Sequence, residues 1–305
     1  MRSSAGLPAW QLFVVAVAIW STTWHAILYQ LAHTTVEWGV TLRFALAGLL
    51  ALALAAWRGD RLRCTPREHA LLALQGVFLY SLSYVAIYNA ERHVPSGLVA
   101  VGYSASPLVN GIGAWLLWRT PLRARFVVGG ILCVAGVSLI FWPQFSQVVE
   151  GSATALGAGY TVAAVLSSAV GSLAASRNAA HRLPFWAALG WGMLYGAALS
   201  LLVALARGQA LVVPTAPSWW LSLAYLSIAG SVVAFACYLA LQQRIGPGPA
   251  ATIGVMTPVL ALLVSALLEG FRPGALTWVG TLLAVFGNAL ILLPRFRPAG
   301  VPAAR

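Results

Sequence analysis

The stretch FVVGGILCVAGVSLIFWP at residues 126–143 recurs in altered form as TWVGTLLAVFGNALILLP at residues 277–294. Eight of the eighteen positions are identical when the chain is shifted by 151 residues. The same shift places Gly97 on Gly248 and Pro107 on Pro258 without a gap. One register held over this distance indicates a duplicated unit. We therefore expect two related halves, residues 1–150 and 151–305, that together form one transport domain.

The composition indicates the environment in which the chain folds. Of its 305 residues, 60% are hydrophobic and 8% are charged, whereas about 25% of the residues in soluble domains are charged. The mean hydropathy is +0.85. No soluble core needs so much apolar sequence, so we predict a polytopic membrane protein in contact with the lipid bilayer. The net charge of +12 comes from 18 arginines, most of them between apolar runs, so we expect no nucleic-acid partner.

Ten apolar segments follow one another along the chain. Each has about 17–25 residues, the length of a helix that spans a bilayer, and only helices satisfy their own backbone hydrogen bonds in lipid at this length. They cover residues 10–31, 37–57, 69–90, 97–118, 126–142, 153–176, 184–206, 219–243, 248–268 and 275–293. Each half holds five, so the second half enters the membrane from the opposite side. The predicted fold is all-α, with ten transmembrane helices as two inverted-topology five-helix repeats.

The arginines decide the predicted orientation. With the N-terminus in the cytoplasm, fourteen arginines fall on the cytoplasmic side and three, Arg92, Arg207 and Arg272, on the outer side. Short cytoplasmic loops of membrane proteins carry the excess of basic residues. We therefore expect a multi-pass protein of the cell inner (plasma) membrane with both termini in the cytoplasm.

Two prolines lie at matched positions near the middle of the fourth and ninth segments. Pro107 and Pro258 each remove a backbone donor, which leaves the carbonyls of Tyr103 and Gly254 without their helical partners. Interrupted helices at corresponding places in two halves point to a binding site at the membrane midplane. The alternative is a pair of simple kinks, because membrane helices tolerate proline. We predict that both prolines break their helices beside a cavity and take part in gating.

The order of several segments resembles a known family. AIWSTTWHAI in the first segment, LRFALAGLLAL in the second, ASPLVNGIGAWLL in the fourth and VMTPVLALLVSALLEG in the ninth resemble the EamA-type exporters of the drug/metabolite transporter superfamily. The likeness covers nearly the whole chain, and the aromatic content is most similar to the YddG-type amino-acid exporters. It implies a single-chain bundle that exports small metabolites by alternating access. The family usually ends both matched helices with glutamate, whereas this chain has Trp118 in the first half and Glu269 in the second.

Polar and aromatic residues along four segments are candidates for substrate binding. In the first segment, Trp20 and Trp24 are four residues apart, as are Ser21 and His25, so they form two adjacent rows on one helix face. His25 suits substrate binding or proton exchange; the alternative is a neutral imidazole bonded to a helix neighbour. The candidates in the third, fourth and ninth segments are Tyr80, Ser83, Tyr84, Tyr88, Tyr103, Ser106, Asn110 and Thr257. Packing without substrate contact remains the alternative for the aromatic residues.

Arg43 is the one arginine inside a predicted span. It has three readings: its side chain extends to the outer membrane surface, it forms a structural pair with Glu37 or Glu91, or it binds a substrate carboxylate. Weaker cavity candidates are Tyr160, Ser167, Ser168, Ser231 and Tyr238.

Aromatic surfaces beside hydroxyls, an amide and free carbonyls suit a small amphiphile, most of all a neutral or aromatic amino acid. Together with the family resemblance, which implies export by a secondary transporter, this chemistry predicts an exporter of such molecules, with the proton as a candidate coupling ion. A cationic drug, a polyamine or a sugar nucleotide is the alternative cargo. A more distant alternative is an intramembrane serine hydrolase with Ser104 as nucleophile and His25 as base, but Pro107 would disturb the helix start that such motifs require. We predict no enzyme, no cofactor and no metal site; the oligomeric state is left open.

Overall fold

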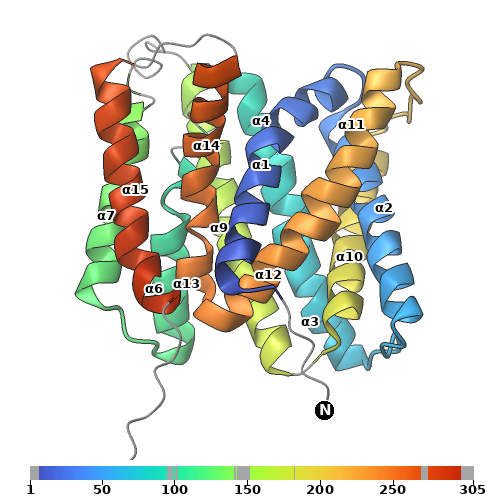
Figure 1. Cartoon of the computed structure of the whole chain (residues 1–305). Helices are drawn as coiled ribbons and strands as arrows, with labels where there is room; N and C mark the ends of the chain where they lie inside the picture. Colours follow the sequence, from blue (N-terminus) through green and yellow to red (C-terminus); the bar gives the residue numbers. More distant parts are fainter. Residues whose placement is uncertain are drawn as a thin grey trace, which may run out of the picture.

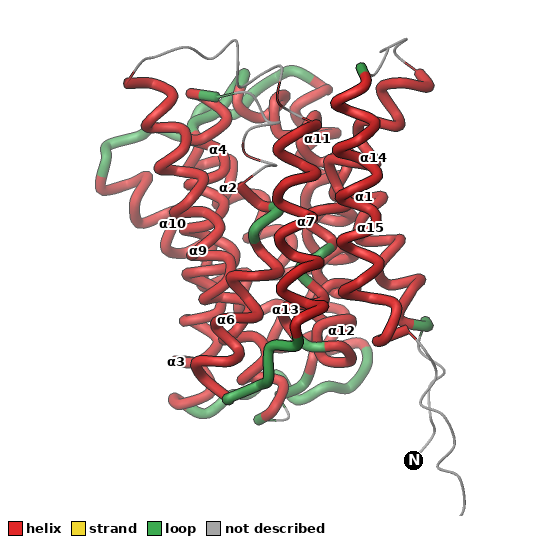
Figure 2. The backbone as a smooth tube through the Cα atoms, turned by 90° about the vertical axis from the view of Figure 1, so that its left-hand side faces the viewer, coloured by secondary structure: helices red, strands yellow, loops and turns green. Residues whose placement is uncertain are grey.

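The computed structural model describes residues 7–94, 99, 102–140, 142, 152–181, 183–268 and 274–296. Within this part the chain is helical and has no strand, which confirms the all-α class. The helices form one bundle, with most loops at its two ends (Figures 1 and 2). In the first half they are α1 (Ala9–Leu31), α2 (Val36–Trp57), α3 (Pro66–Gly76), the π-helical η1 (Val77–Leu82), α4 (Ser83–His93), α6 (Ser106–Trp118) and α7 (Ala124–Ile140). In the second half they are α9 (Ser152–Ala180), α10 (Phe185–Ala206), α11 (Pro217–Ser227), the π-helical η2 (Ile228–Val233), α12 (Ala234–Ile245), α13 (Pro247–Ala250), α14 (Ile253–Leu268) and α15 (Ala275–Phe296).

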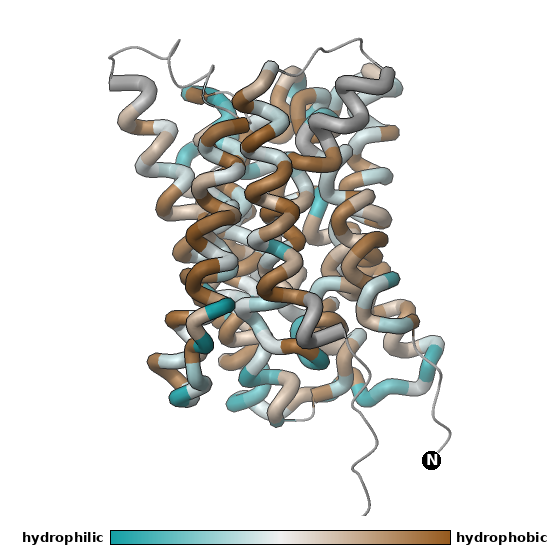
Figure 3. Tube along the Cα trace, turned by 60° about the vertical axis from the view of Figure 1, so that its left-hand side comes forward, coloured by the Kyte–Doolittle hydropathy of each residue, from teal (hydrophilic) through white to brown (hydrophobic). Residues whose placement is uncertain are grey.

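The described helices include seven that are long and apolar enough to cross a membrane. They are Ala9–Leu31, Val36–Trp57, Pro66–His93, Ala155–Ala180, Phe185–Ala206, Pro217–Ile245 and Ala275–Leu292. Ala124–Ile140 is a shorter apolar helix. Each apolar segment expected from the sequence overlaps helical structure. Apolar residues occupy much of the middle of the bundle, and many hydrophilic residues lie toward its ends (Figure 3).

Two of the long helices change from α to π and back at equivalent places. η1 begins at Val77 and η2 at Ile228, and 228 − 77 = 151 is the offset that relates the two sequence halves. A π-turn holds more residues than an α-turn, so it changes the direction in which the following side chains point. The two π-turns therefore set which faces of α4 and α12 reach the centre of the bundle.

Each π-turn is in contact with a helix of the other half. On α9, Gly171 leaves no room for a side chain, because a Cβ atom there would lie 2.5 Å from the backbone nitrogen of Leu79. On α1, the indole Nε1 of Trp20 donates to the carbonyl oxygen of Gly230 at 3.0 Å. Trp20 and Gly171 are 151 residues apart, and so are Leu79 and Gly230. The two contacts are therefore equivalent under the sequence offset.

Glycines allow α7 and α15 to pack closely at one edge of the bundle (Figure 1). A Cβ atom at Gly129 would lie 2.7 Å from the carbonyl oxygen of Gly287, and one at Gly136 would lie 2.6 Å from that of Gly280. Small residues permit such close backbone approach between membrane helices. Gly129 and Gly280, like Gly136 and Gly287, are 151 residues apart, so this crossing is also equivalent under exchange of the halves.

The structure corrects the position of the second expected helix break. α6 begins at Ser106, so Pro107 lies in its first turn, as the first predicted break requires. Pro258, in contrast, lies inside α14, and the chain leaves the helical path earlier, at Ala251 and Thr252 between α13 and α14. The run of glycine and proline at residues 246–249, in which Gly246 has a φ of +91°, ends α12 and begins the one-turn α13, so the chain is already divided into short helices before α14 begins. α14 starts afresh beyond that run and tolerates its single internal proline.

Candidate functional site

A cavity of about 100 Å³ lies in the centre of the bundle. Helices of both halves contribute to it, among them α1, α4 and α6 from the first half and α9, α12 and α14 from the second. The residues that line it are Trp20, Thr23, Ile27, Leu79, Ser83, Tyr84, Ile87, Tyr103, Ser106, Asn110, Ser168, Phe235, Tyr238, Ala251, Ile253, Gly254 and Thr257. This set holds no carboxylate and no guanidinium, so the lining is neutral.

The positions beside the two predicted breaks meet at this cavity. Tyr103 and Gly254, which are 151 residues apart, are neighbours in space: a Cβ atom at Gly254 would lie 3.6 Å from the backbone oxygen of Tyr103. Ser106 and Thr257 line the cavity one residue before their prolines, and Pro107 and Pro258 are themselves buried. The structure thus brings Tyr103 beside Gly254 and places Ser106 and Thr257 on the same cavity.

Several predicted substrate-binding residues line the cavity, namely Trp20, Ser83, Tyr84, Tyr103, Ser106, Asn110 and Thr257. Ser168 and Tyr238, the weaker candidates, line it as well. Thr23 and Phe235 do so without having been predicted. Thr23 is one of three consecutive hydroxyl residues, of which the spacing selected Ser21, and Phe235 is one ring in an apolar run that carries no periodic signal. The equivalence of η1 and η2, once known, would have pointed to Phe235, two residues beyond η2.

Other predicted residues lie elsewhere. Tyr80 is fully buried and accepts a hydrogen bond from Gln75 at 3.3 Å. Tyr88 is fully buried and donates to the side-chain oxygen of Gln30 at 3.3 Å. The hydroxyl of Ser21 donates to the carbonyl of Val17 at 2.6 Å. Along the tyrosine row, Tyr84 alone lines the cavity, because a row of every fourth residue winds around its helix and η1 adds a further rotation.

His25 is exposed on α1, and its ring contacts Tyr29 with ring centroids 5.4 Å apart. Ser104, the nucleophile of the hydrolase alternative, is fully buried. The side chain of Trp24 and the whole of Glu269 lie outside the described part of the chain, so the predictions for them stay predictions.

One wall of the cavity is aromatic. The rings of Trp20 and Phe235 meet edge to face with centroids 5.0 Å apart, and Tyr238 lies 5.6 Å from Trp20. Tyr84 closes the same cluster, 6.2 Å from Phe235. Edge-to-face packing fixes these rings in place. They offer a rigid apolar surface to a ligand.

The part of the lining that α6 contributes is polar and contains two buried side-chain oxygens without a hydrogen-bond partner in the described structure. Ser106 Oγ and Asn110 Oδ1 are both buried and have no hydrogen-bond partner within the described structure. The amide nitrogen of Asn110 donates to the Ser106 carbonyl at 2.9 Å, which fixes the side chain. An unsatisfied buried polar atom costs about 1–3 kcal/mol. A bound polar molecule in the cavity would remove that cost.

The EamA-like transporter family matches residues 8–142 and 155–293, which together are most of the chain. The chain belongs to this family. Transport across a membrane is therefore the function class of this EamA chain, and its family is one of transporters rather than enzymes.

Proteins of similar sequence are also named as transporters. The uncharacterized inner membrane transporter YedA of Escherichia coli K12 is 27% identical over 300 residues, which cover 97% of this chain and 94% of that relative. An uncharacterized transporter of Synechocystis is 27% identical over 292 residues, 88% of this chain and 86% of the relative. One solved structure superposes with a TM-score of 0.77 at 21% identity and covers 96% of this chain and 98% of its own. That structure supports the fold alone.

Arg43 of the EamA chain is buried at 1% exposure. Its Nε donates to Ser231 Oγ at 2.9 Å and its Nη2 to the Gly230 carbonyl at 3.4 Å, while its guanidinium carbon lies 4.7 Å from the centre of the Tyr84 ring. Nη1 is buried and has no hydrogen-bond partner in the described structure. Arg43 therefore lies behind the aromatic wall of the cavity and contacts that wall through Tyr84.

The expected ion pair of Arg43 is not formed. Glu37 instead accepts hydrogen bonds from Arg207 and Gln209, and both carboxylate oxygens of Glu91 are buried without a partner in the described chain. Six residues separate Glu37 from Arg43, which is about 9 Å along the helix and a turn of about 240° around it. The two side chains therefore leave α2 on different faces.

Proposed function

We propose that this chain exports small amphiphilic metabolites, foremost neutral and aromatic amino acids, across the inner membrane by alternating access. The observation that carries the proposal is the cavity, which is lined both by a cluster of aromatic rings and by Ser106 and Asn110, whose buried side-chain oxygens have no partner in the described structure. Apolar side chains suit the wall, and an ammonium group donates to such oxygens. We include in this proposal the resemblance to YddG-type amino-acid exporters, which rests on the aromatic content of the chain.

A neutral cavity favours a molecule with no large net charge. Burying a charge without a partner is costly, and the lining holds neither the carboxylates that a polyamine needs nor the several cations that a sugar nucleotide needs. A zwitterionic amino acid needs one cation for its carboxylate. Arg43 supplies one behind Tyr84 and has a free Nη1. We assign carboxylate recognition to Arg43 within this proposal.

We infer further that the chain crosses the membrane ten times, as inverted five-helix repeats 1–150 and 151–305. Three equivalences under the 151-residue offset support this: the π-turns, the contacts of Trp20 with Gly230 and of Gly171 with Leu79, and the glycine crossing of α7 with α15. In the glycine crossing, Gly129 meets Gly287 and Gly136 meets Gly280, so the two helices run antiparallel. Antiparallel equivalent helices are what a two-fold axis in the membrane plane produces.

The places where the helices are interrupted suit a carrier with two states. Broken and π-helical segments bend more easily than continuous α-helix, and here they surround the cavity at η1, η2, residues 104–105 and residues 251–252. We propose that Pro107 and Pro258 guide this bending, with the proton as a candidate coupling ion. Each state would then open the cavity to one side of the membrane.

Efflux from proteoliposomes tests the proposal. Vesicles loaded with labelled phenylalanine or tryptophan should release it in a saturable manner, and the comparison with and without a pH gradient tests proton coupling. The Asn110→Ala variant should lose at least about tenfold in efflux, because it removes a polar partner of the ligand. Ser138→Ala on α7, whose hydroxyl bonds only to the Val134 carbonyl of its own helix, should behave as wild type. Vesicles that release neither amino acid under any gradient would contradict the proposed cargo.

A further inference from the structure

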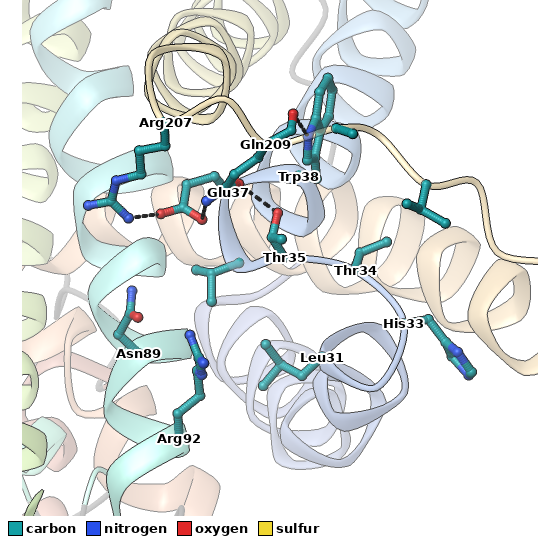
Figure 4. A pocket seen from close by; sticks show the side chains of 13 residues that line it. Leu31, His33, Thr34, Thr35, Glu37, Trp38, Asn89, Arg92, Arg207 and Gln209 are labelled. Atoms are coloured by element: carbon teal, nitrogen blue, oxygen red, sulfur yellow. Dashed lines mark hydrogen bonds and ion pairs between the residues drawn. The ribbon is translucent and has the colours of Figure 1, made fainter.

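A second and larger cavity, of about 420 Å³, lies at the end of the bundle where α1 joins α2 and α10 joins α11 (Figure 4). Its walls come from that first loop, the start of α2, the end of α4 and the second loop. This is the end predicted to face the outside of the cell. Polar and charged side chains line it, among them Glu37, Asn89, Arg92, Arg207 and Gln209.

Glu37 provides no free negative charge to this outer cavity. It is 3% exposed; Arg207 donates to its Oε1, and Gln209 donates to its Oε2 at 3.0 Å. Gln209 is held in turn, because Thr35 donates to its side-chain oxygen at 2.7 Å and Trp38 to its backbone oxygen at 3.1 Å. Figure 4 shows this chain of contacts along one wall. The carboxylate is thus neutralised by one guanidinium within a fixed network.

Arg92 remains as the unpaired charge of the outer cavity. Its side chain extends from α4 into the space that Asn89 and Glu37 also border (Figure 4). Within the described chain it forms neither a hydrogen bond nor an ion pair. Arginine stays protonated in proteins and presents a planar fork that matches a carboxylate. Asn89 lies one helical turn earlier; its amide nitrogen donates to the Val85 carbonyl at 2.8 Å, which leaves the amide oxygen as an acceptor.

We propose that this outer cavity is a second binding site, which takes the carboxylate of a small organic molecule on Arg92. The Asn89 oxygen would accept from an ammonium or hydroxyl group of the same molecule. This inference rests on the proposed function and extends it, because the molecule bound in the outer cavity would be the exported molecule on its way out. The fixed pair of Glu37 and Arg207 forms the opposite wall and prevents Glu37 from repelling the anion.

Binding to the full-length protein in phosphatidylcholine nanodiscs tests the site. The probe is labelled 3-phenylpropionate, which has a carboxylate and no ammonium group. Saturable binding is expected, and Arg92→Gln should weaken it at least about tenfold, which is about 1.4 kcal/mol. Arg92 makes no contact that its loss would break, so this variant should fold. Arg58→Gln removes the same charge at the opposite end of α2 and should bind as wild type. Equal affinity in wild type and Arg92→Gln would overturn the inference.

Two further arms separate the sources of the anion and the two sites. In nanodiscs with phosphatidylglycerol, binding of the probe should persist; its complete displacement would mean that lipid headgroups occupy the site, and would overturn the inference. Ser138→Ala, which lies on α7 outside both cavities, should leave probe binding unchanged. If efflux of amino acids fails while Arg92-dependent binding persists, the proposed cargo falls and the outer site stands. If efflux of amino acids occurs while Arg92→Gln binds the probe as wild type does, the outer site is wrong and the proposed cargo stands.

Discussion

The indole nitrogen of Trp20 donates to the carbonyl oxygen of Gly230 at 3.0 Å, and the equivalent positions of the other half, Gly171 and Leu79, are also in contact. In both cases a helix that begins one half meets the π-turn of the other half. Both Trp20 and Leu79 line the central cavity. Contacts between the halves and the shape of the cavity are therefore set by the same residues.

Gly171→Ala should disturb η1. The new Cβ atom would lie 2.5 Å from the backbone nitrogen of Leu79, so one of the two helices must move, and such overpacking costs about 1–3 kcal/mol. Gly159→Ala on the same helix is the matched control, since nothing lies within 4 Å of its Cβ position; it should gain up to about 1 kcal/mol of helix propensity. Thermal unfolding in detergent measures both variants. Equal stability of the two would show that the close approach at Gly171 does not exist.

Ser106→Ala should leave stability unchanged or raise it. Its hydroxyl oxygen is buried without a partner in the described structure, so the substitution removes a cost of desolvation. Ser200→Ala should lower stability by about 1 kcal/mol, because its hydroxyl pairs with Ser81 at 2.7 Å. Phenylalanine binding should change in the opposite sense, weakened in Ser106→Ala and intact in Ser200→Ala. A marked loss of stability in Ser106→Ala would mean that this hydroxyl serves the fold.

Arg43→Met separates a structural role from carboxylate recognition. The guanidinium is buried without a carboxylate partner among the described ion pairs, so it carries a desolvation cost that the apolar side chain of methionine does not. We expect a folded protein whose efflux of phenylalanine falls at least about tenfold. Efflux of phenethylamine, which lacks the carboxylate, should be unchanged. Equal loss for both molecules would exclude carboxylate recognition by Arg43.

Cys64 reports the orientation of the chain. It lies between α2 and α3, whereas Cys133 and Cys237 are buried in the bundle. A membrane-impermeant maleimide should label inside-out vesicles and spare right-side-out vesicles, because the loop is predicted to be cytoplasmic. Burial, followed by the nearby Glu68 carboxylate, raises the pKa of the Cys64 thiol above its ordinary value. The reactive form is the thiolate, so labelling at pH 7.5 should be slower than that of free cysteine and should speed up as the pH rises. Labelling of right-side-out vesicles alone would reverse the topology.

The helices were predictable because the length of an apolar segment can be read directly from the residue types. The 151-residue register is likewise visible in the sequence alone. The 151-residue offset read from Val128 to Pro143 also relates η1 to η2, although no residue pattern indicates a π-turn. Ser106 and Thr257 were found because each lies directly before a matched proline, and Asn110 lies three residues beyond Pro107 on the same helix.

The direction of individual side chains was less predictable. His25 and Trp20 lie on the same helix, yet His25 is exposed and Trp20 lines the cavity. Spacing alone defines faces but does not say which one turns inward. The positions of Tyr80 and Tyr88 away from the cavity could be predicted only with knowledge of the π-turn η1. The position of Phe235 in the cavity could be predicted only with knowledge of the equivalent π-turn η2. The pairing of Glu37 with Arg207 joins residues 170 positions apart, which only the tertiary structure brings together.

Accessibility at Gly254 tests the central claim most directly. Its Cβ position has ordinary contact distance to the Tyr103 oxygen and faces the cavity, so Gly254→Cys, with the three native cysteines replaced by alanine, should fold. A charged, impermeant methanethiosulfonate should modify this cysteine in both right-side-out and inside-out vesicles, and phenylalanine should slow the modification from either side. Modification from one side only, or at a rate that phenylalanine leaves unchanged, would contradict a cavity that opens alternately to the two sides.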